Sequence, residues 1–278
     1  MTVRITTLSE NTAMLGDFLG EWGLSVLVEM DGVTVLLDSG SGRSVVHNAD
    51  SLSIDLRKVD KIVLSHGHYD HTGGLREVLR RMRKQVEVIA HPDIWQAKYA
   101  RRRNQPARYI GIPFQRRELE SLGANFRLTT KSVAITDSIL TTGEIPMVND
   151  FERIDDILVV DQDGELKPDE LADDQALVIK TGQGLVVVLG CAHRGMINTL
   201  YWAQRLTGVS RVHAVIGGSH LISASGEQID RTIAVLKELD VRRLSLCHCT
   251  GLKAISVLAG EFGDRFVFNA VGSVIEVS

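Results

Sequence analysis

The sequence predicts an α/β fold in which mixed β-sheets carry helices on their outer faces. Two observations support this prediction. Short apolar runs alternate with turn signals along most of the chain, a pattern that is typical of strands. Each half of the chain also begins with a hairpin and continues with alternating strands and helices, and packing helices on the outside of mixed sheets buries the apolar faces of both.

The first half begins with a hairpin around Asp31-Gly32, a strong signal for a two-residue turn. Gly73-Gly74 later precedes a helix whose apolar residues recur on one face. The expected elements are strands 24–30, 33–37 and 61–65, helix 75–83 and strand 86–90. Residues 93–128 are less regular and carry a cluster of basic residues, so we expect an insertion there that lies over the active site.

The second half follows the same order. A hairpin links strands 176–180 and 185–189 through the turn Thr181-Gly182-Gln183-Gly184. The later elements expected are helix 196–206, strand 212–216, helix 228–239, strand 243–247 and helix 254–262. Since no low-complexity linker separates the halves, we expect a single domain over residues 1–278.

Composition and charge exclude several classes of function. The net charge is −4 and the pI is near 6.1, which argues against a nucleic-acid partner. No apolar stretch approaches the ~20 residues of a membrane span, and residues 1–11 lack the apolar core of a signal peptide. Three cysteines provide no disulfide framework, so a reducing, cytoplasmic location is expected. The oligomeric state is left open.

One basic cluster departs from this acidic balance. It comprises the run from Lys98 to Arg103, Arg108 and the pair Arg116-Arg117. Such a run is usually a solvated helix face. The alternative is a patch that meets a small anionic substrate, such as a phosphate.

Histidines gather where the expected strands end. The histidines that follow the end of an apolar strand are His66, His91, His193, His220 and His248. Strand ends at one edge of a sheet are where binding sites form in α/β folds. We therefore expect several of these imidazoles to share one site.

The run from Ser65 to His71 carries most of the chemistry. His66, His68, Asp70 and His71 place four possible metal ligands within six residues, and Gly67 allows the segment to curl. Imidazole with carboxylate suits Zn²⁺, Fe or Mn better than Ca²⁺ or Mg²⁺. One ion could take His66 and His68 and a second Asp70 and His71. A polar loop without metal is the alternative, but four such residues after a buried strand disfavour it.

These residues resemble a known signature. Ser-His-Gly-His-Tyr-Asp-His-Thr-Gly-Gly, residues 65–74, is similar to that of the metallo-β-lactamase superfamily, and Asp38 resembles the superfamily's earlier Asp, which supports the metal site. The resemblance narrows to the branch of the 7,8-dihydropterin-6-methyl-4-(β-D-ribofuranosyl)aminobenzene-5'-phosphate synthases. The segments that carry this narrower resemblance are 21–25, 47–49, 142–146, 173–177, 190–193, 217–221 and 248–251.

The resemblance implies an αββα sandwich of two mixed sheets with helices on the outer faces, and two sets of metal ligands. The first set is His66, His68 and His193, and the second is Asp70, His71 and His248. One or two Zn²⁺ ions are expected, with Mn, Fe or Mg as alternatives.

The chain departs from the superfamily at the carboxylate that normally bridges the two metals. The matching strand, 212–216, ends in Gly-Gly-Ser-His, and no Asp or Glu occurs between His193 and Glu227. His220 or Cys191 could take that place, or the second metal position could be weak. A smaller departure is Trp22, where this branch often has His.

Other residues have both a structural and a functional interpretation. His91 could touch substrate, and Arg194, Lys98 and the arginines at 101–103 could hold an anion. Cys191 is either a buried packing residue or a ligand. Cys247 and Cys249 lack the second cysteine pair of a structural zinc site, so we interpret both as packing residues.

The expected function is a metal-dependent hydrolase that acts on a small anionic, phosphate-containing molecule through a metal-bound hydroxide. Asp70 and His220 are the candidate catalytic residues. The first alternative is a dihydropterin-type transferase that displaces pyrophosphate. The second is a metal or redox module without hydrolysis, which the missing bridging carboxylate and the absence of a flavin-domain sequence disfavour.

Overall fold

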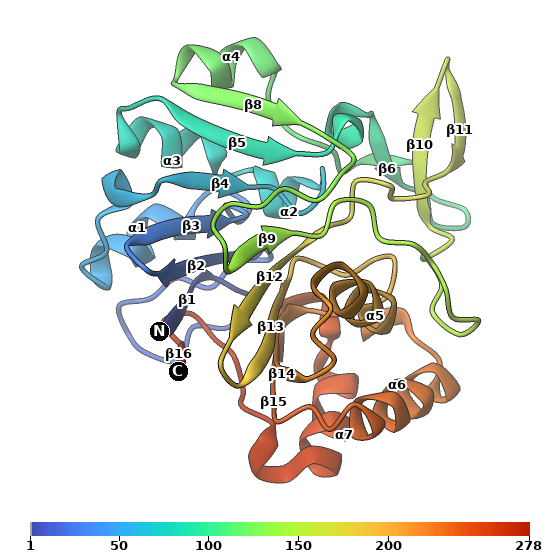
Figure 1. Ribbon diagram of the computed structural model, residues 1–278. Helices are drawn as coiled ribbons and strands as arrows, with labels where there is room; N and C mark the ends of the chain where they lie inside the picture. Colours follow the sequence, from blue (N-terminus) through green and yellow to red (C-terminus); the bar gives the residue numbers. More distant parts are fainter. Residues whose placement is uncertain (1) are drawn as a thin grey trace.

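The computed structural model describes residues 2–278, and two β-sheets packed face to face form its centre (Figure 1). Helices lie on the outer face of each sheet, so the layers follow the order helix, sheet, sheet, helix. This confirms the predicted αββα sandwich.

The larger sheet is built mainly from the first half of the chain (Figure 1, blue to green). Its seven strands lie in the order β16 (Val274–Val277), β1 (Val3–Ser9), β2 (Ser25–Met30), β3 (Val33–Leu37), β4 (Lys61–Val63), β5 (Val86–Ala90) and β8 (Ala124–Leu128). The pairs from β16 to β3 are antiparallel, and those from β3 to β8 are parallel. The helices of this half are α1 (Ser44–Ser51), α2 (Tyr69–Thr72), α3 (Leu75–Met82) and α4 (Arg116–Ser121).

The second sheet comes from the second half (Figure 1, yellow to red). Its five strands lie in the order β15 (Arg243–Cys247), β14 (Val212–Gly218), β13 (Gly184–Leu189), β12 (Ala176–Thr181) and β9 (Ile139–Thr141). Strands β13, β14 and β15 are parallel, so their carboxyl ends meet at one edge. The covering helices are α5 (Met196–Thr207), α6 (Gly226–Glu238) and α7 (Leu252–Phe262).

A small third sheet extends from one end of the sandwich (Figure 1, upper right). Its strands lie in the order β11 (Glu165–Pro168), β10 (Leu158–Gln162), β6 (Lys98–Ala100) and β7 (Arg108–Tyr109). The basic run at Lys98 therefore begins as a strand, and the expected solvated helix is wrong. The segment 93–128 is also divided, because β6 and β7 belong to the small sheet whereas β8 joins the edge of the larger sheet and α4 packs beside it.

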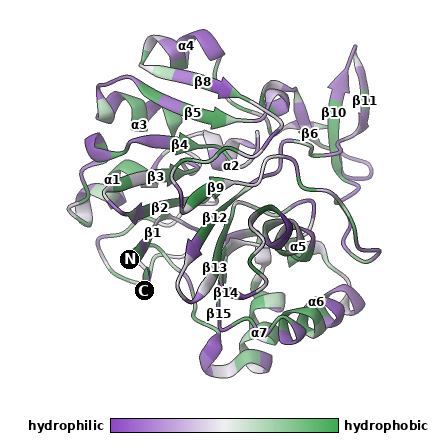
Figure 2. Cartoon of the chain, viewed as in Figure 1, coloured by the Kyte–Doolittle hydropathy of each residue, from purple (hydrophilic) through white to green (hydrophobic). Residues whose placement is uncertain are grey.

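Burial on both faces explains why the central strands are continuously apolar. In β13, Val186 and Val188 face the other sheet, whereas Leu185 and Val187 face the helices. Such a strand leaves no position for a polar side chain. Figure 2 shows the result, with mainly hydrophobic colour along the central strands and both hydrophobic and hydrophilic colour on the covering helices.

Most strands and helices expected from the sequence are present. The hairpin turn at Asp31-Gly32 has φ values of 54° and 78°, as a two-residue turn of this kind requires. The sequence did not reveal β1, in which buried Thr6, Thr7 and Ser9 break the apolar pattern, or its partner β16. No helix within residues 2–278 combines the length and apolar composition needed to cross a membrane.

Candidate metal centre

The candidate site lies where carboxyl ends of strands from the two sheets approach each other. The loop after β4 and the short helix α2 carry His66, His68, Asp70 and His71. The residues after β13, β14 and β15 are Cys191 and His193, His220, and His248, respectively. Because β13, β14 and β15 are parallel neighbours, their ends place these side chains together.

The first expected ligand set, His66, His68 and His193, forms a buried cluster. His66 Nε2 lies 3.0 Å from His68 Nδ1 and 3.2 Å from His193 Nε2. Tetrahedral coordination by ring nitrogens would separate neighbouring nitrogens by about 3.3 Å. Burial lowers the pKa of His68 to about 3 and lowers those of His66 and His193 strongly, so the imidazoles are neutral. Neutral imidazoles with converging nitrogens fit a metal ion.

The second expected set, Asp70, His71 and His248, lies beside the first. Asp70 Oδ2 is 3.5 Å from His248 Nε2 and 4.0 Å from His71 Nε2. Burial tends to raise the pKa of Asp70, but the imidazoles of His248 and His71 outweigh burial and lower it, so the carboxylate is charged. His248 Nε2 is buried without a hydrogen-bond partner, which suits an atom that binds an ion.

Asp38 orients His71, a member of the second set, through a hydrogen bond. Its Oδ2 lies 2.7 Å from His71 Nδ1, which leaves His71 Nε2 turned toward the site. Ser65 holds the carboxylate by donating from Oγ at 2.6 Å and from its backbone N–H at 2.7 Å. Burial disfavours charge on His71, but Asp38 and Asp70 raise its pKa to about 9. Asp38 thus has the supporting position that the sequence resemblance implied.

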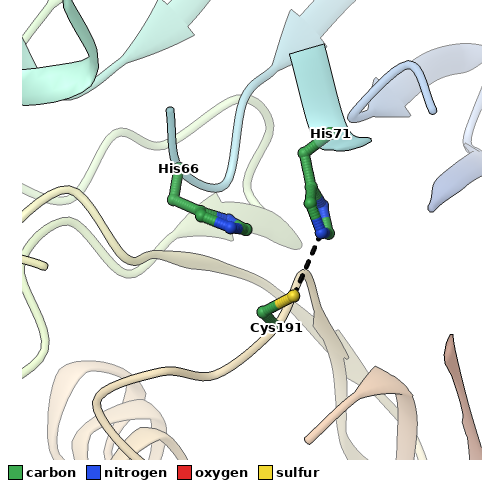
Figure 3. Close-up of side chains that lie close together, drawn as sticks. All are labelled: His66, His71 and Cys191. Carbon is green, nitrogen blue, oxygen red and sulfur yellow. Dashed lines mark hydrogen bonds between the residues drawn. The ribbon is translucent and has the colours of Figure 1, made fainter. Parts of the chain in front are cut away.

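Cys191 lies between the two ligand sets. Its Sγ is 3.0 Å from His71 Nε2, and Figure 3 shows the thiol approaching His71 from the segment after β13, with His66 alongside. The thiol, one nitrogen of His66 and one of His71 all lie within 4.8 Å of one another. A second thiol, Cys249, accepts the backbone N–H of His220 at 3.2 Å.

A cavity of about 410 Å³ opens above the two ligand sets. His68, Asp70, Cys191, His193 and His220 reach its surface. Its apolar walls are formed by Trp22, Tyr69, Ala100, Ile110, Ile157, Leu158 and Ile222. Arg102 and Arg108 supply positive charge, and the guanidinium of Arg108 lies 5.6 Å from the ring of Tyr69.

His220 is held close to the first set. Its ring centroid is 4.1 Å from that of His193, and its Nδ1 is buried without a hydrogen-bond partner. Burial opposes charge on His220, but nearby Cys249 raises its pKa. This candidate catalytic residue therefore lies at the cavity with one free ring nitrogen.

Two other expected substrate residues, His91 and Arg194, lie elsewhere. His91 Nε2 is 2.9 Å from Glu144 Oε1, and His91 is not among the described residues that line the cavity. Arg194 donates its backbone N–H to Asp174 and directs its guanidinium to the carbonyl of Glu170. Neither residue is positioned to hold substrate.

Lys98, also expected to hold an anion, is buried and paired. Its Nζ lies 2.8 Å from Asp169 Oδ2 and 2.9 Å from Asp173 Oδ1. Asp173 in turn accepts the backbone N–H of Gly67 at 2.8 Å, inside the histidine run. Lys98 therefore supports the loop that carries His66 and His68 and cannot contact a substrate in the cavity.

Backbone strain concentrates at this site. Asp38, Ala192, His220 and His248 have φ values of 59°, 52°, 46° and 50°, in the left-handed region that residues with side chains rarely adopt. Such conformations cost of order 1–3 kcal/mol each and gather at functional sites. Neither this strain nor the supporting roles of Ser65 and Asp173 were predicted from the sequence.

Comparisons with known proteins agree with this geometry. A family model described as the metallo-β-lactamase superfamily matches residues 23–248. The chain is 32% identical to the 7,8-dihydropterin-6-methyl-4-(β-D-ribofuranosyl)-aminobenzene-5'-phosphate synthase of Methanocaldococcus jannaschii, over 99% of this chain and 96% of the relative. It is 31% identical to an uncharacterized protein of the same archaeon, over 98% of this chain and 100% of the relative.

A solved structure is similar over the whole fold. It is the crystal structure of a metal-dependent hydrolase of the β-lactamase superfamily, with a TM-score of 0.86 and 30% sequence identity. The similarity covers 99% of each chain. The relatives thus include one named for synthesis and one named for hydrolysis.

Proposed function

Because this chain belongs to the metallo-β-lactamase superfamily, in the branch of the dihydropterin synthase-like enzymes, we propose that it is a metal-dependent transferase. The proposed reaction transfers a dihydropterin, through its methyl carbon, to an aromatic acceptor and releases pyrophosphate. The named synthase, similar over almost its full length, supports this reaction over the hydrolysis expected first from the sequence.

The cavity carries the proposal for the substrate class. Its volume of about 410 Å³ is within the range of about 300–1,000 Å³ typical of small-molecule sites. Trp22 and Tyr69 offer ring surfaces to a flat heterocycle, and Arg102 and Arg108 offer charge to a phosphate. A small anionic molecule with an aromatic part fits this combination better than a purely polar one.

In the proposed reaction a carbon–nitrogen bond forms between the pterin methyl carbon and the amino group of the acceptor, and the carbon–oxygen bond to pyrophosphate breaks. Bound divalent ions supply Lewis acidity that offsets charge developing on the leaving group. Arg102 and Arg108 bind and orient the anion, and the apolar walls exclude water. His220, which lines the cavity, accepts the proton that the acceptor's amino group loses.

Hydrolysis of a phosphate ester is the second candidate, and the hydrolase with 30% identity favours it. In this case water replaces the aromatic acceptor, and the Asp70 carboxylate orients it. We also propose one or two Zn²⁺ ions as the native metal and a cytoplasmic location, which three free, buried cysteines support.

Parallel assays separate the two reactions. The protein, loaded in turn with Zn²⁺, Mn²⁺ and Mg²⁺, is given a dihydropterin-methyl diphosphate with an aminobenzene ribofuranosyl phosphate, or a bis-phosphodiester alone. We expect coupled product and pyrophosphate in equal amounts from the first mixture. Hydrolysis of the diester without any coupling would overturn the transferase proposal in favour of hydrolysis.

Arginine variants test the anion site independently of the reaction. Arg108→Ala removes a cation from the cavity and should raise KM for the phosphorylated substrate by about tenfold or more, since a hydrogen bond to a charged group contributes about 1.5–3 kcal/mol. Arg101→Ala is the matched control, because Arg101 is exposed and does not line the cavity. Equal KM values for both variants would contradict this role for Arg108.

A further inference from the structure

The end of β14, where the superfamily's bridging carboxylate was expected, cannot carry a side chain. A Cβ on Gly217 would collide with the carbonyl oxygen of Leu189, and the φ of Gly217 is 110°. A Cβ on Gly218 would collide with the carbonyl oxygen of Gly190 and lie 2.7 Å from Cys249 Sγ. Close approach of the neighbouring β13 segment therefore requires glycine at both positions.

The same neighbouring segment brings a different donor to the site. Cys191 lies two residues after the end of β13, is 3% exposed, and places Sγ 3.0 Å from His71 Nε2. The Cys191 thiol belongs to three groups of possible ligand atoms, and the atoms of each group lie within 4.8 Å of one another. Its partners are His66 and His71 in one group, His193 and His220 in another, and His248 and Cys249 in the third. It is therefore close to ligand atoms of both expected metal positions, as Figure 3 shows for His66 and His71.

We propose that Cys191 is the shared ligand of the two metal positions and replaces the missing carboxylate. A thiolate is a softer ligand than a carboxylate, so the centre should favour Zn²⁺, Co²⁺ or Cd²⁺ over Mg²⁺ and Mn²⁺. The proposal rests on the metal binding proposed above, but it does not depend on which reaction the enzyme performs.

Cys249 is the competing sulfur donor. Its Sγ already accepts the His220 N–H and lies 3.6 Å from the carbonyl oxygen of Cys191. It is grouped with Cys191 and His248 but with no ligand of the first metal position. Cys249 could therefore reach the second ion only, whereas Cys191 can reach both.

Cobalt substitution tests the proposal without an activity measurement. Metal-free full-length protein is titrated with Co²⁺, and bound ions are counted while sulfur-to-cobalt charge-transfer absorption is recorded. We expect two ions per chain and a charge-transfer band. Cys191→Ala should lose the band and weaken the second ion at least about tenfold, since even residues that only support ligands contribute 10–100-fold to metal affinity.

Further variants make the result decisive. Cys191→Asp restores a carboxylate and should keep two ions, lose the band and bind Mn²⁺ better relative to Cd²⁺ than wild type does. Cys249→Ala should keep the band. Cys247→Ala is the folding control, because Cys247 is fully buried, packs in the core between the sheets and belongs to none of the metal-ligand clusters.

A failure of the proposed role of Cys191 can be distinguished from a failure of the proposed function. Two bound ions without a band, or a band that persists in Cys191→Ala, would overturn the role of Cys191 and leave the metal enzyme intact. Wild-type protein that binds no ion at all would overturn the proposed function as well. Circular dichroism of each variant separates lost ligands from lost folding.

Discussion

Lys98 is almost completely buried, with 1% of its surface exposed, although the three arginines that follow Ala100 are exposed. Burying an ammonium group is costly unless opposite charges meet it. Asp169 and Asp173 supply those charges, and Asp173 also holds the backbone of Gly67. Lys98, through Asp173, therefore links the small third sheet to the loop that carries His66 and His68.

Lys98→Met should lower the free energy of unfolding by about 3–5 kcal/mol, because it leaves two carboxylates buried without their cation. Urea unfolding measures this loss. Lys167→Met is the control, since Lys167 forms an exposed ion pair with Glu165 and its loss should cost less than about 1 kcal/mol. Equal losses for the two variants would show that the buried charges are satisfied in another way.

The buried carboxyl group of Asp174 should make the free energy of unfolding depend on pH. Burial raises its pKa from 3.8 in an unfolded chain to about 7 in the folded protein. Between these values the folded state binds the proton more strongly, so stability is favoured at low pH and falls as pH rises toward 7. The slope from this group is at most about 1.4 kcal/mol per pH unit.

Asp174→Asn should remove that slope, as measured by urea unfolding of metal-free protein from pH 4 to 8. The exposed control Asp163→Asn should keep it. A wild-type slope in the Asp174 variant would mean that another group causes the dependence.

At the scale of elements, α5 begins at Met196 without a side-chain cap from its own preceding residue, Gly195. The distant carboxylate of Glu152 performs this function by accepting the N–H groups of Ile197 and Asn198, each at 2.8 Å. A negative charge at a helix N-terminus also interacts favourably with the helix dipole. Since α5 starts three residues after His193, this cap helps to position an expected metal ligand.

Glu152→Ala should therefore lower the free energy of unfolding by about 1–3 kcal/mol and weaken metal binding at the same time. Thermal unfolding and a metal titration measure the two effects. Asp150→Ala removes a nearby exposed carboxylate and should leave metal affinity at the wild-type value. Unchanged stability in the Glu152 variant would assign the cap to other groups.

The sequence predicted elements where a single local pattern dominates. The ligand run 65–71 was recognisable because its residues are contiguous, and the apolar strands were recognisable because they are buried on both faces. Glu152 and Lys98 escaped prediction because their partners are 45 and 75 residues away in the sequence. The end of β14 has no room for a side chain because Leu189 and Gly190 lie against it. This close approach likewise depends on packing between strands, which no local pattern reveals.

At the scale of the whole molecule, the candidate metal centre lies between the two sheets and draws its expected ligands from both. His66, His68, Asp70 and His71 come from the larger sheet's side, and His193 and His248 from the other. A ligand that binds only the folded state stabilises it by about 2.7 kcal/mol at one hundred times its Kd.

Chelation with EDTA should therefore lower Tm by several degrees, and Zn²⁺ should restore it. Differential scanning calorimetry measures this shift. His213→Ala, which alters a histidine outside the metal-ligand clusters, should show the same metal-dependent shift as wild type. Identical Tm values with and without metal would contradict a centre that links the two halves.

The pairing of β1 with β16 has a consequence for synthesis of the chain. The first strand, Val3–Ser9, gains its outer neighbour only when Val274–Val277 has been made, and the set of expected ligands is complete only when His248 has been made. A nascent chain on the ribosome thus has both an unpaired sheet edge and an incomplete ligand set until these two segments have been made. Metal capture should therefore require synthesis through His248, and ribosome-bound chains that stop before His248 should be the forms most prone to aggregation.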